Sequence, residues 1–305
     1  MMAALVIDPN EPTGLGFDQV PEPVPAPHQV LLDVHHVSIN HGELRTEVFP
    51  AGRVHGHDAA GVVTRAAADR DGPAAGTRVV AFGAGAWAQR MAVSVADLAE
   101  VPESVELGSA AALPMAGFSA LRALRAGGPI IGRRVLVTGA SGGVGRFAVQ
   151  LAAIGGAHVI ASVGSPPRAR GLRELGAHQV VVGLDGIDTP VDLILDTVGG
   201  PQLVAAWHLL APAGTIQSIG WASEQPAVFP PYSLFAVGTA KSIQSFEDSA
   251  RVGRDLSVLV RLVATGALLP PVGWRGPWQR FADATHTLRA RQVAGKAVLD
   301  VTPID

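Results

Sequence analysis

The fold of this chain is decided by the stretch Val135-Leu136-Val137-Thr138-Gly139-Ala140-Ser141-Gly142-Gly143-Val144-Gly145. An apolar run typical of a β-strand enters a turn dense in glycine, and a helical pattern follows over residues 146–152. A second strand pattern comes at residues 157–163, within the length of one βαβ unit. Glycines let the backbone approach a phosphate, whose charge is favoured at a helix N-terminus. The stretch predicts a binding site for the pyrophosphate of a dinucleotide; the alternative is a purely structural turn.

The composition excludes several classes of protein. Hydrophobic residues make up 48% of the 305 residues and charged ones 16%, yet no apolar run reaches the roughly 20 residues of a membrane span. The N-terminus lacks the basic region of a signal peptide. A net charge of -3 gives no reason to expect nucleic acid. The absence of cysteine excludes disulfides and thiolate zinc ligands, and it fits the cytoplasmic location that we expect.

The order of predicted elements divides the chain. Short strands dominate the first third, at residues 5–7, 29–37, 61–64 and 77–82, and the prolines of residues 21–27 predict an extended spacer. Strands then alternate with helices. The strands are expected near 134–138, 157–163, 179–182, 191–195, 214–219 and 241–246, and the helices near 143–154, 166–175, 200–210 and 249–265. Regular alternation predicts an α/β fold with a parallel, doubly wound sheet. A helix near 278–290 and a strand at 296–301, which could rejoin the first domain, end the chain.

Five stretches carry a resemblance to a known family, and together they span nearly the whole chain. They are a Gly-x-Asp-x-x-Gly turn at 56–61, a helix start at 110–120, the phosphate loop at 135–152, a strand end at 192–200 and a closing strand at 295–299. In this order and spacing the chain resembles the medium-chain dehydrogenase/reductase superfamily, in its zinc-free quinone oxidoreductase (zeta-crystallin-like) branch.

The resemblance implies two domains and a nicotinamide cofactor. A GroES-like, mainly β substrate domain would comprise residues 1–114 and 267–305, and a Rossmann domain that binds NADPH would comprise residues 115–266. Relatives commonly dimerise through the edge strand of the Rossmann sheet. The candidate strand here is Ala240-Lys241-Ser242-Ile243-Gln244-Ser245-Phe246, so we expect a homodimer.

Cofactor contacts are expected at the ends of the Rossmann strands. The backbone N–H groups of Ser141, Gly142, Gly143 and Val144 should face the pyrophosphate, and Gly142 and Gly145 also suit close helix–strand packing. The first glycine of the usual fingerprint is Ala140 here. By resemblance, the other cofactor-binding residues are Asn40, Ser119, Val163, Gly164, Ser165, Arg168, Thr197, Val198, Ile219, Gly220, Phe246 and Lys296.

The end of the second Rossmann strand favours NADPH over NADH. Sites for NAD place an acid there to bind the ribose hydroxyls, but residues 163–170 contain none. Ser165 and Arg168 can instead meet a 2′-phosphate, because a guanidinium donates paired hydrogen bonds to phosphate. The alternative is that Arg168 is a solvated residue of a first helical turn. One departure weakens the prediction of NADPH: a tyrosine that often follows the next strand in this branch is absent, and Gly183 sits near its position.

A metal site is not expected. His57 stands where zinc-dependent relatives have a ligand, but the positions of their other ligands carry Asn40 and Met115. One imidazole beside an aspartate is not a zinc site, and the role of His57 is a hydrogen-bonded turn residue or a proton-transfer group. The alternative is an ion held by four side chains, His41, His55, His57 and Glu43.

The substrate side is expected around Asn40, which falls at the branch's asparagine beside the nicotinamide ring. It is the expected catalytic residue, since it can hydrogen-bond ribose or a substrate carbonyl without titrating. The family's Asn-x-x-Asp pattern is Asn40-x-x-Glu43 here. Arg45 stands where an aromatic residue is common and either favours an anionic substrate or points to solvent. Met115 and Trp221 complete the expected pocket, with core packing as the alternative for Trp221.

These features predict a zinc-independent, NADPH-dependent oxidoreductase. Hydride would pass to a small molecule, either a quinone or the activated carbon–carbon double bond of an enone or enoyl compound, with the proton coming from solvent. A non-catalytic NADPH-binding structural or sensing protein is one alternative. An alcohol dehydrogenase-like enzyme is the other, and the missing cysteines disfavour it.

Overall fold

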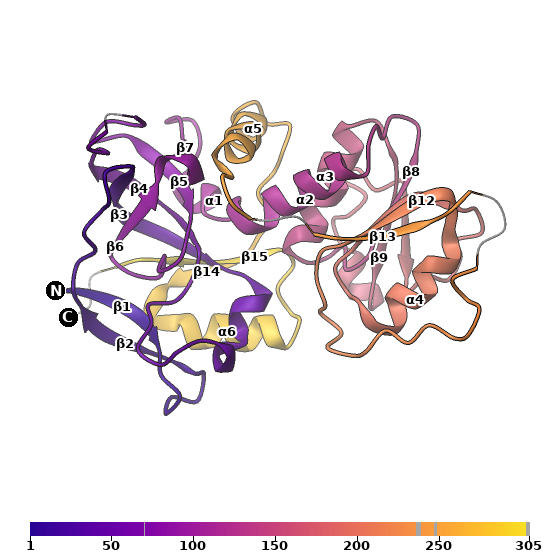
Figure 1. Ribbon diagram of the computed structural model, residues 1–305, viewed down its shortest axis with the longest axis horizontal. Helices are drawn as coiled ribbons and strands as arrows, with labels where there is room; N and C mark the ends of the chain where they lie inside the picture. The colour runs from indigo at the N-terminus through magenta and orange to yellow at the C-terminus, as the bar shows by residue number, and fades with distance from the viewer. Residues whose placement is uncertain (70, 236–238, 247–248, 303–305) are drawn as a thin grey trace. The chain divides into compact units, whose positions relative to one another are not determined.

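The structure is a computed structural model that describes residues 1–69, 71–235, 239–246 and 249–302 (Figure 1). It divides into two units, residues 1–118 with 249–305 and residues 119–248. The sequence placed these boundaries at 114 and 267 instead. Most of the difference lies in α5 (Gly253–Ala264), which packs on β7 (Leu98–Glu100) and therefore joins the first unit. Asp97 accepts a 3.0 Å hydrogen bond from the backbone of Val252, at the start of this helix.

The second unit is a six-stranded parallel sheet with the strand order β10-β9-β8-β11-β12-β13. The strands are β8 (Arg134–Val137), β9 (His158–Val163), β10 (Gln179–Val182), β11 (Val191–Asp196), β12 (Leu210–Ser218) and β13 (Ser242–Ser245), and the helices are α3 (Gly143–Ile154) and α4 (Gly200–Leu209). The order reverses between β8 and β11, the place where such sheets bind ligands beyond the carboxyl ends of their strands. The predicted doubly wound Rossmann sheet is confirmed.

The apolar runs of the sequence form the inner strands of this sheet. Val135, Leu136 and Val137 of β8 are fully buried, as are Leu193 and Ile194 of β11. Parallel strands are covered on both faces, so their sequences read as continuous apolar runs rather than as alternating ones. The continuous apolar run of residues 135–137 therefore predicts a buried strand directly before the phosphate loop.

The first unit is a mainly antiparallel, GroES-like domain. Its large sheet has the order β14-β15-β3-β4-β5-β7, with β6 also paired to β3, and β1 pairs with β2 in a separate sheet. The closing strand β15 (Lys296–Asp300) pairs antiparallel with β3 (Gln29–Ile39), so the end of the chain rejoins the first unit. The other strands are β1 (Met2–Ile7), β2 (Leu15–Val20), β4 (Asp58–Arg65), β5 (Arg78–Phe82), β6 (Arg90–Ser94) and β14 (Val272–Pro277).

Helices complete the first unit around a core that contains Trp87 and Trp278, both fully buried. The α-helices are α1 (Leu107–Ala110), α5 and α6 (Phe281–Arg289), together with the start of α2 (Pro114–Ala126), which continues into the second unit from Ser119. The short 3-10 helices of the described residues are η1 (His41–Leu44), η2 (Thr46–Val48), η3 (Val95–Asp97), η4 (Pro166–Ala169) and η5 (Trp278–Arg280), of which η4 belongs to the second unit.

The helix predicted over residues 166–175 is wrong. Only the 3-10 helix η4 forms, and turns follow it. Pro166 and Pro167 supply no backbone N–H, and Gly171 has φ +78, a conformation outside any right-handed helix. Strands β2, β6, β7 and β14 were not predicted, because their apolar residues are few or are interrupted by glycine and proline.

Candidate active site

The carboxylate of Asp58 is the centre of a buried hydrogen-bond network in the first unit. Asp58 begins β4, pairs with Ser38 of β3 and is fully buried. Its Oδ2 accepts 2.9 Å hydrogen bonds from the Ser38 hydroxyl and from the Asn40 amide nitrogen. Its Oδ1 accepts a 3.1 Å bond from the backbone N–H of Met115, in the first turn of α2. Asp58 therefore ties the end of β3 to the start of a helix.

Lys296 supplies the positive charge of this network. It begins β15 and is 2% exposed. Its ammonium donates to three oxygens, at 3.0 Å to the backbone of Ile39, at 2.6 Å to Oδ1 of Asn40 and at 3.1 Å to Oδ2 of Asp58. An ammonium can only donate, so the amide oxygen of Asn40 faces Lys296 and its nitrogen faces Asp58. The sequence predicted a cofactor contact for Lys296, but with all three donors used we assign it to holding Asn40.

Asn40 keeps one polar hydrogen for a bound molecule. Its Nδ2 carries two hydrogens, of which Asp58 accepts one. The residue is partly exposed just after β3. Asn40 is thus an oriented, non-titrating donor, which suits the catalytic role that the sequence predicts for it.

Glu43 links Asn40 to His57. The Glu43 carboxylate lies in η1 and the residue is 4% exposed. Its Oε2 accepts a 2.7 Å hydrogen bond from the backbone N–H of Asn40, and its Oε1 lies 2.8 Å from Nδ1 of His57. The His57 ring also stacks on Phe82, with ring centroids 5.6 Å apart. The imidazole is therefore held by a carboxylate and by an aromatic face.

The electrostatics favour an ion pair between Glu43 and His57. Burial alone would raise the pKa of Glu43, but the hydrogen bond and charge of His57, with the charge of Lys296, hold that pKa below its usual range. The hydrogen bond to Glu43 raises the pKa of His57, against the opposing effect of burial. His55 differs, because burial lowers the pKa of its imidazole, whose Nε2 lies 2.8 Å from the backbone oxygen of Glu43.

These side chains do not fit a tetrahedral metal site. The resemblance places Asn40 and Met115 near two ligand positions of zinc-dependent relatives, and neither an amide nor a thioether is a usual zinc ligand. His57 and Glu43 are committed to each other. Among the described residues, no group of three His, Cys, Asp or Glu side chains is placed to hold a metal ion. We therefore derive no step through a metal.

In the second unit, the glycine-rich turn leads from β8 directly into α3. Gly142 precedes the helix in an extended conformation, with φ -79 and ψ 179, and the first N–H groups of a helix have no partners within it. A Cβ on Gly145 would collide with the carbonyl oxygen of Gly139, so glycine is required for this approach. The four predicted pyrophosphate contacts are all partly exposed, as binding requires: Ser141, Gly142, Gly143 and Val144.

Asp196, at the end of β11, fixes the neighbouring strand ends. Its carboxylate, whose pKa is raised by burial, accepts a 2.6 Å hydrogen bond from the Thr138 hydroxyl and a 2.8 Å bond from the backbone of Gly199. Its backbone oxygen accepts from the N–H groups of Ile219 and Gly220. The adjacent ends of β11 and β12 therefore carry four predicted cofactor-binding residues, Thr197, Val198, Ile219 and Gly220.

The end of β9 carries basic side chains rather than an acidic one. Val163 ends the strand, Ser165 precedes η4 and Arg168 lies within it. The Arg168 guanidinium lies beside Gly164, where a Cβ would be 3.5 Å from its Nη1. The strand end that the sequence assigned to a 2′-phosphate thus has an arginine next to it.

Arg146 is a site residue that the sequence analysis missed. It lies in the first turn of α3, where its Nε donates to the backbone oxygen of Ser141 at 3.3 Å. Its Nη2 donates to the backbone oxygen of Arg170 at 2.8 Å, and burial lowers the pKa of its guanidinium. Arg146 joins the phosphate loop to the segment after β9. The available signal was an arginine directly after the last glycine of the fingerprint, Gly145.

Arg45 and Trp221, both predicted to line the substrate pocket, are solvent-accessible. The Arg45 side chain is 65% exposed, and its Nε lies 3.4 Å from Glu47. Trp221 is 45% exposed, rests against Gly199 and donates its indole N–H to the backbone oxygen of Gln225 at 2.6 Å. Core packing, the alternative for Trp221, is wrong. The pocket roles of both residues stay predictions.

Two predicted cofactor residues lie on α2 and after β13. Ser119 is 2% exposed. Phe246 lines a hollow of about 200 Å³ within the second unit. Its other lining residues come from α2, β12, β13 and the residue after β13: Arg122, Ala123, Ala126, Gln217, Gln244 and Ser245.

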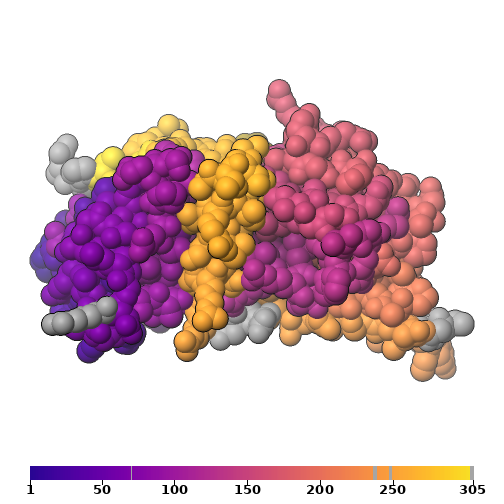
Figure 2. Space-filling view, turned by 90° about the horizontal axis from the view of Figure 1, so that it is seen from above, coloured from indigo at the N-terminus to yellow at the C-terminus, as the bar shows by residue number. Residues whose placement is uncertain are grey.

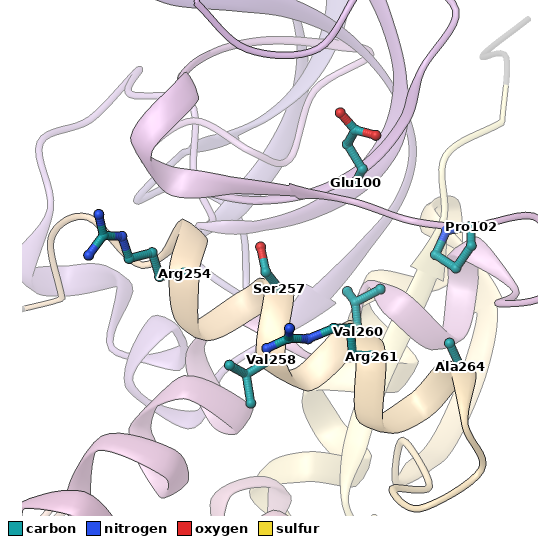
Figure 3. Close-up of a pocket in the computed structure, with 8 residues that line it drawn as sticks. All are labelled: Glu100, Pro102, Arg254, Ser257, Val258, Val260, Arg261 and Ala264. Carbon is teal, nitrogen blue, oxygen red and sulfur yellow. The ribbon is translucent and has the colours of Figure 1, made fainter.

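A larger hollow, of about 630 Å³, lies in the first unit beside α5 (Figure 3). The segment of α5 is at the surface in the space-filling view (Figure 2). Glu100 and Pro102 form one side, and Arg254, Ser257 and Arg261 of α5 form the other (Figure 3). None of its lining residues belongs to the Asn40 network or to the phosphate loop. This hollow is therefore not part of the candidate active site.

Known proteins resemble both units. Residues 26–103 match the family described as the alcohol dehydrogenase GroES-like domain, and residues 143–264 match the family described as zinc-binding dehydrogenase. A chloroplast envelope quinone oxidoreductase homolog of Arabidopsis thaliana is 34% identical over 64% of this chain and 63% of its own length. The chain belongs to the medium-chain dehydrogenase/reductase superfamily, in its quinone oxidoreductase branch.

Other similar proteins include a much longer chain and a protein solved with bound cofactor. The lovastatin diketide synthase lovF of Aspergillus terreus is 29% identical over 98% of this chain, but the match spans 13% of the synthase. A mycobacterial protein solved in complex with NADPH is 25% identical, with a TM-score of 0.88 over 99% of this chain and all of that one. Of the helices formed by the described residues, none has the length and apolar character of a membrane span.

Proposed function

We propose that this protein is a zinc-independent, NADPH-dependent reductase of quinones or of activated carbon–carbon double bonds. The observation that carries the proposal is the buried network of Asn40, Asp58 and Lys296. It offers an oriented amide donor, Asn40, which the resemblance places beside the nicotinamide ring. The homodimer and the cytoplasmic location expected from the sequence also stay predictions.

The second unit supports NADPH as the cofactor. The phosphate loop leads into the N-terminus of α3, which favours a pyrophosphate. Arg168 beside the end of β9 supplies a cation for a 2′-phosphate, and Arg146 holds the loop next to that segment. The NADPH complex of a mycobacterial relative supports the same choice.

The side chains of the first unit favour a conjugated acceptor. The charge that develops when a simple carbonyl is reduced stays on one oxygen, and stabilising it normally takes a metal ion. A quinone or enone avoids this demand, because the negative charge that develops on hydride addition is spread onto a remote oxygen. The free Nδ2 hydrogen of Asn40 can stabilise that oxygen, or the ribose, in the transition state. Nicotinamide, when bound, supplies the hydride.

Label transfer tests this function. The purified protein is incubated with NADPH that carries deuterium at C4 of the nicotinamide and with an enone or a quinone. We expect the reduced enone to gain one deuterium at its β-carbon, in a reaction that a chelator leaves unchanged. NADPH binding with neither label transfer to an enone nor oxidation of NADPH by a quinone would favour the non-catalytic alternative instead.

A further inference from the structure

One titratable pair in the first unit has no part in the proposed function. His57 and Glu43 join at 2.8 Å through Nδ1 and Oε1. The second ring nitrogen of His57, Nε2, has no hydrogen-bond partner among the described residues, and the side chain is 24% exposed. The pair therefore leaves a single nitrogen accessible to a bound molecule.

The surroundings of His57 distinguish it from a purely structural histidine. His55, two residues earlier, is 2% exposed and its Nε2 is bonded to a backbone oxygen. His57 has the opposite arrangement. Its Nδ1 is held by the carboxylate of Glu43, and its Nε2 has no hydrogen-bond partner among the described residues. Stacking on Phe82 further fixes the ring plane.

The charges around the pair favour a protonated imidazole. The hydrogen bond to Glu43 raises the pKa of His57, burial opposes this shift, and the charges of Glu43 and Asp58 add to it. Arg53 acts in the opposite direction. On the Glu43 side, burial alone would raise the pKa of the carboxyl, but the hydrogen bond and charge of His57 and the charge of Lys296 lower it, which favours the ionised form.

The same carboxylate connects His57 to the predicted catalytic residue. Glu43 Oε2 accepts the backbone N–H of Asn40 while Oε1 holds His57. One buried group thus sets the positions of an amide donor and of an imidazole. We propose that His57, held by Glu43, is the proton donor of the reduction and gives its Nε2 proton to the acceptor. This inference rests on the proposed function.

The chemistry of this step balances. Hydride from NADPH adds to the β-carbon of an enone, and the resulting enolate takes the Nε2 proton of His57 at its α-carbon or oxygen. For a quinone, the proton goes to an oxygen of the reduced ring. NADPH becomes NADP⁺, the acceptor is reduced, and the neutral imidazole, still bonded to Glu43, regains a proton from solvent. The proton source is therefore His57, where the sequence analysis expected solvent.

The test compares pH profiles of three variants, with NADPH and an acceptor that the parent reduces. His57→Gln removes the titrating group, and Glu43→Gln keeps a similar side chain but removes the charge. His35→Gln is the control, because His35 is an exposed histidine that also lies near a carboxylate, 3.5 Å from Asp33. NADPH affinity and circular dichroism verify that each variant is folded.

We expect the turnover of the parent to fall as pH rises through the pKa of His57, because the imidazolium is the active form. His57→Gln should lose this alkaline fall. Its turnover number should be lower than the parent's by a factor of about 10² or more, the usual contribution of a general acid. Glu43→Gln should move the fall to lower pH, because the carboxylate no longer stabilises the imidazolium. His35→Gln should overlay the parent. The solvent deuterium isotope effect should grow in His57→Gln, as proton transfer becomes slower.

Two other outcomes overturn the inference in different ways. A folded His57→Gln variant with the parent's rate and pH profile would exclude His57 as the donor and leave the reductase function intact. A parent that binds NADPH but reduces no acceptor would overturn the reductase function, and the donor role with it.

Discussion

The ammonium of Lys296 donates a 2.6 Å hydrogen bond to Oδ1 of Asn40, although the two residues lie 256 positions apart in the chain. The contact exists because β15 pairs antiparallel with β3, with Ala297 opposite Ile39. The last strand of the chain therefore orients the amide of the predicted catalytic residue. The same ammonium neutralises Asp58, which holds the other end of that amide.

The effects on stability of removing the buried charges of Asp58 and Lys296 should be strongly coupled. Lys296→Met leaves the fully buried Asp58 unpaired, so we expect a loss of about 3–5 kcal/mol in the free energy of unfolding. Asp58→Asn combined with Lys296→Met removes both charges and should lose much less. Urea unfolding of the parent, both single variants and the double variant gives the coupling energy. Additive losses would contradict the role of this pair.

Cofactor choice should depend on Arg168. Arg168→Ala removes a charge-assisted contact and should weaken NADPH binding by about 1.5–3 kcal/mol, with little effect on NADH. Calorimetric titration of both cofactors measures this difference. Arg65→Ala, at an exposed arginine of the first unit, is the control and should change neither affinity. A parent that binds NADH as tightly as NADPH would refute the 2′-phosphate site.

Activity and fold should not depend on zinc. The chain has no cysteine, and His57 is bonded to Glu43, so purified protein should carry no stoichiometric zinc. Dialysis against a strong chelator should leave circular dichroism and NADPH affinity unchanged. One tightly held zinc ion per chain, found by elemental analysis, would overturn this expectation.

We expect a homodimer that forms through β13, an edge strand of the six-stranded sheet. Unpaired edge groups invite a partner strand, and a lysine on an edge discourages it. Ile243→Lys on β13 should therefore shift the protein toward monomer. Val182→Lys on β10, the opposite edge, is the matched control, since Val182 and Ile243 are exposed to similar extents, 44% and 38%. Light scattering that shows only monomer for the parent across the micromolar range would contradict the dimer.

Sequence patterns predicted the second unit well, because its signals are local. The strand, turn and helix from residues 134 to 154 follow one another directly, and α3 has the predicted bounds. The helix predicted over residues 166–175 forms only as the 3-10 helix η4, because Gly171, at φ +78, cannot continue a right-handed helix.

The network around Asn40 could be predicted only in part. Resemblance pointed to Asn40 itself, but Lys296 received a cofactor role because nothing local shows which strand β15 joins. The bond between His57 and Glu43 depends on how η1 packs against the segment before β4, and spacing alone does not determine that. Arg146 was missed for a similar reason, since its partner Arg170 lies beyond the second strand.

The reaction itself is tested most directly by a steady-state screen of the parent and of Asn40→Ala. Quinones, enones and enoyl thioesters are assayed with NADPH, and primary alcohols are assayed with NADP⁺. We predict reduction of at least one conjugated acceptor, negligible alcohol oxidation, and an Asn40→Ala variant that loses turnover more than NADPH affinity. Clear oxidation of simple alcohols without reduction of any conjugated acceptor would contradict this account.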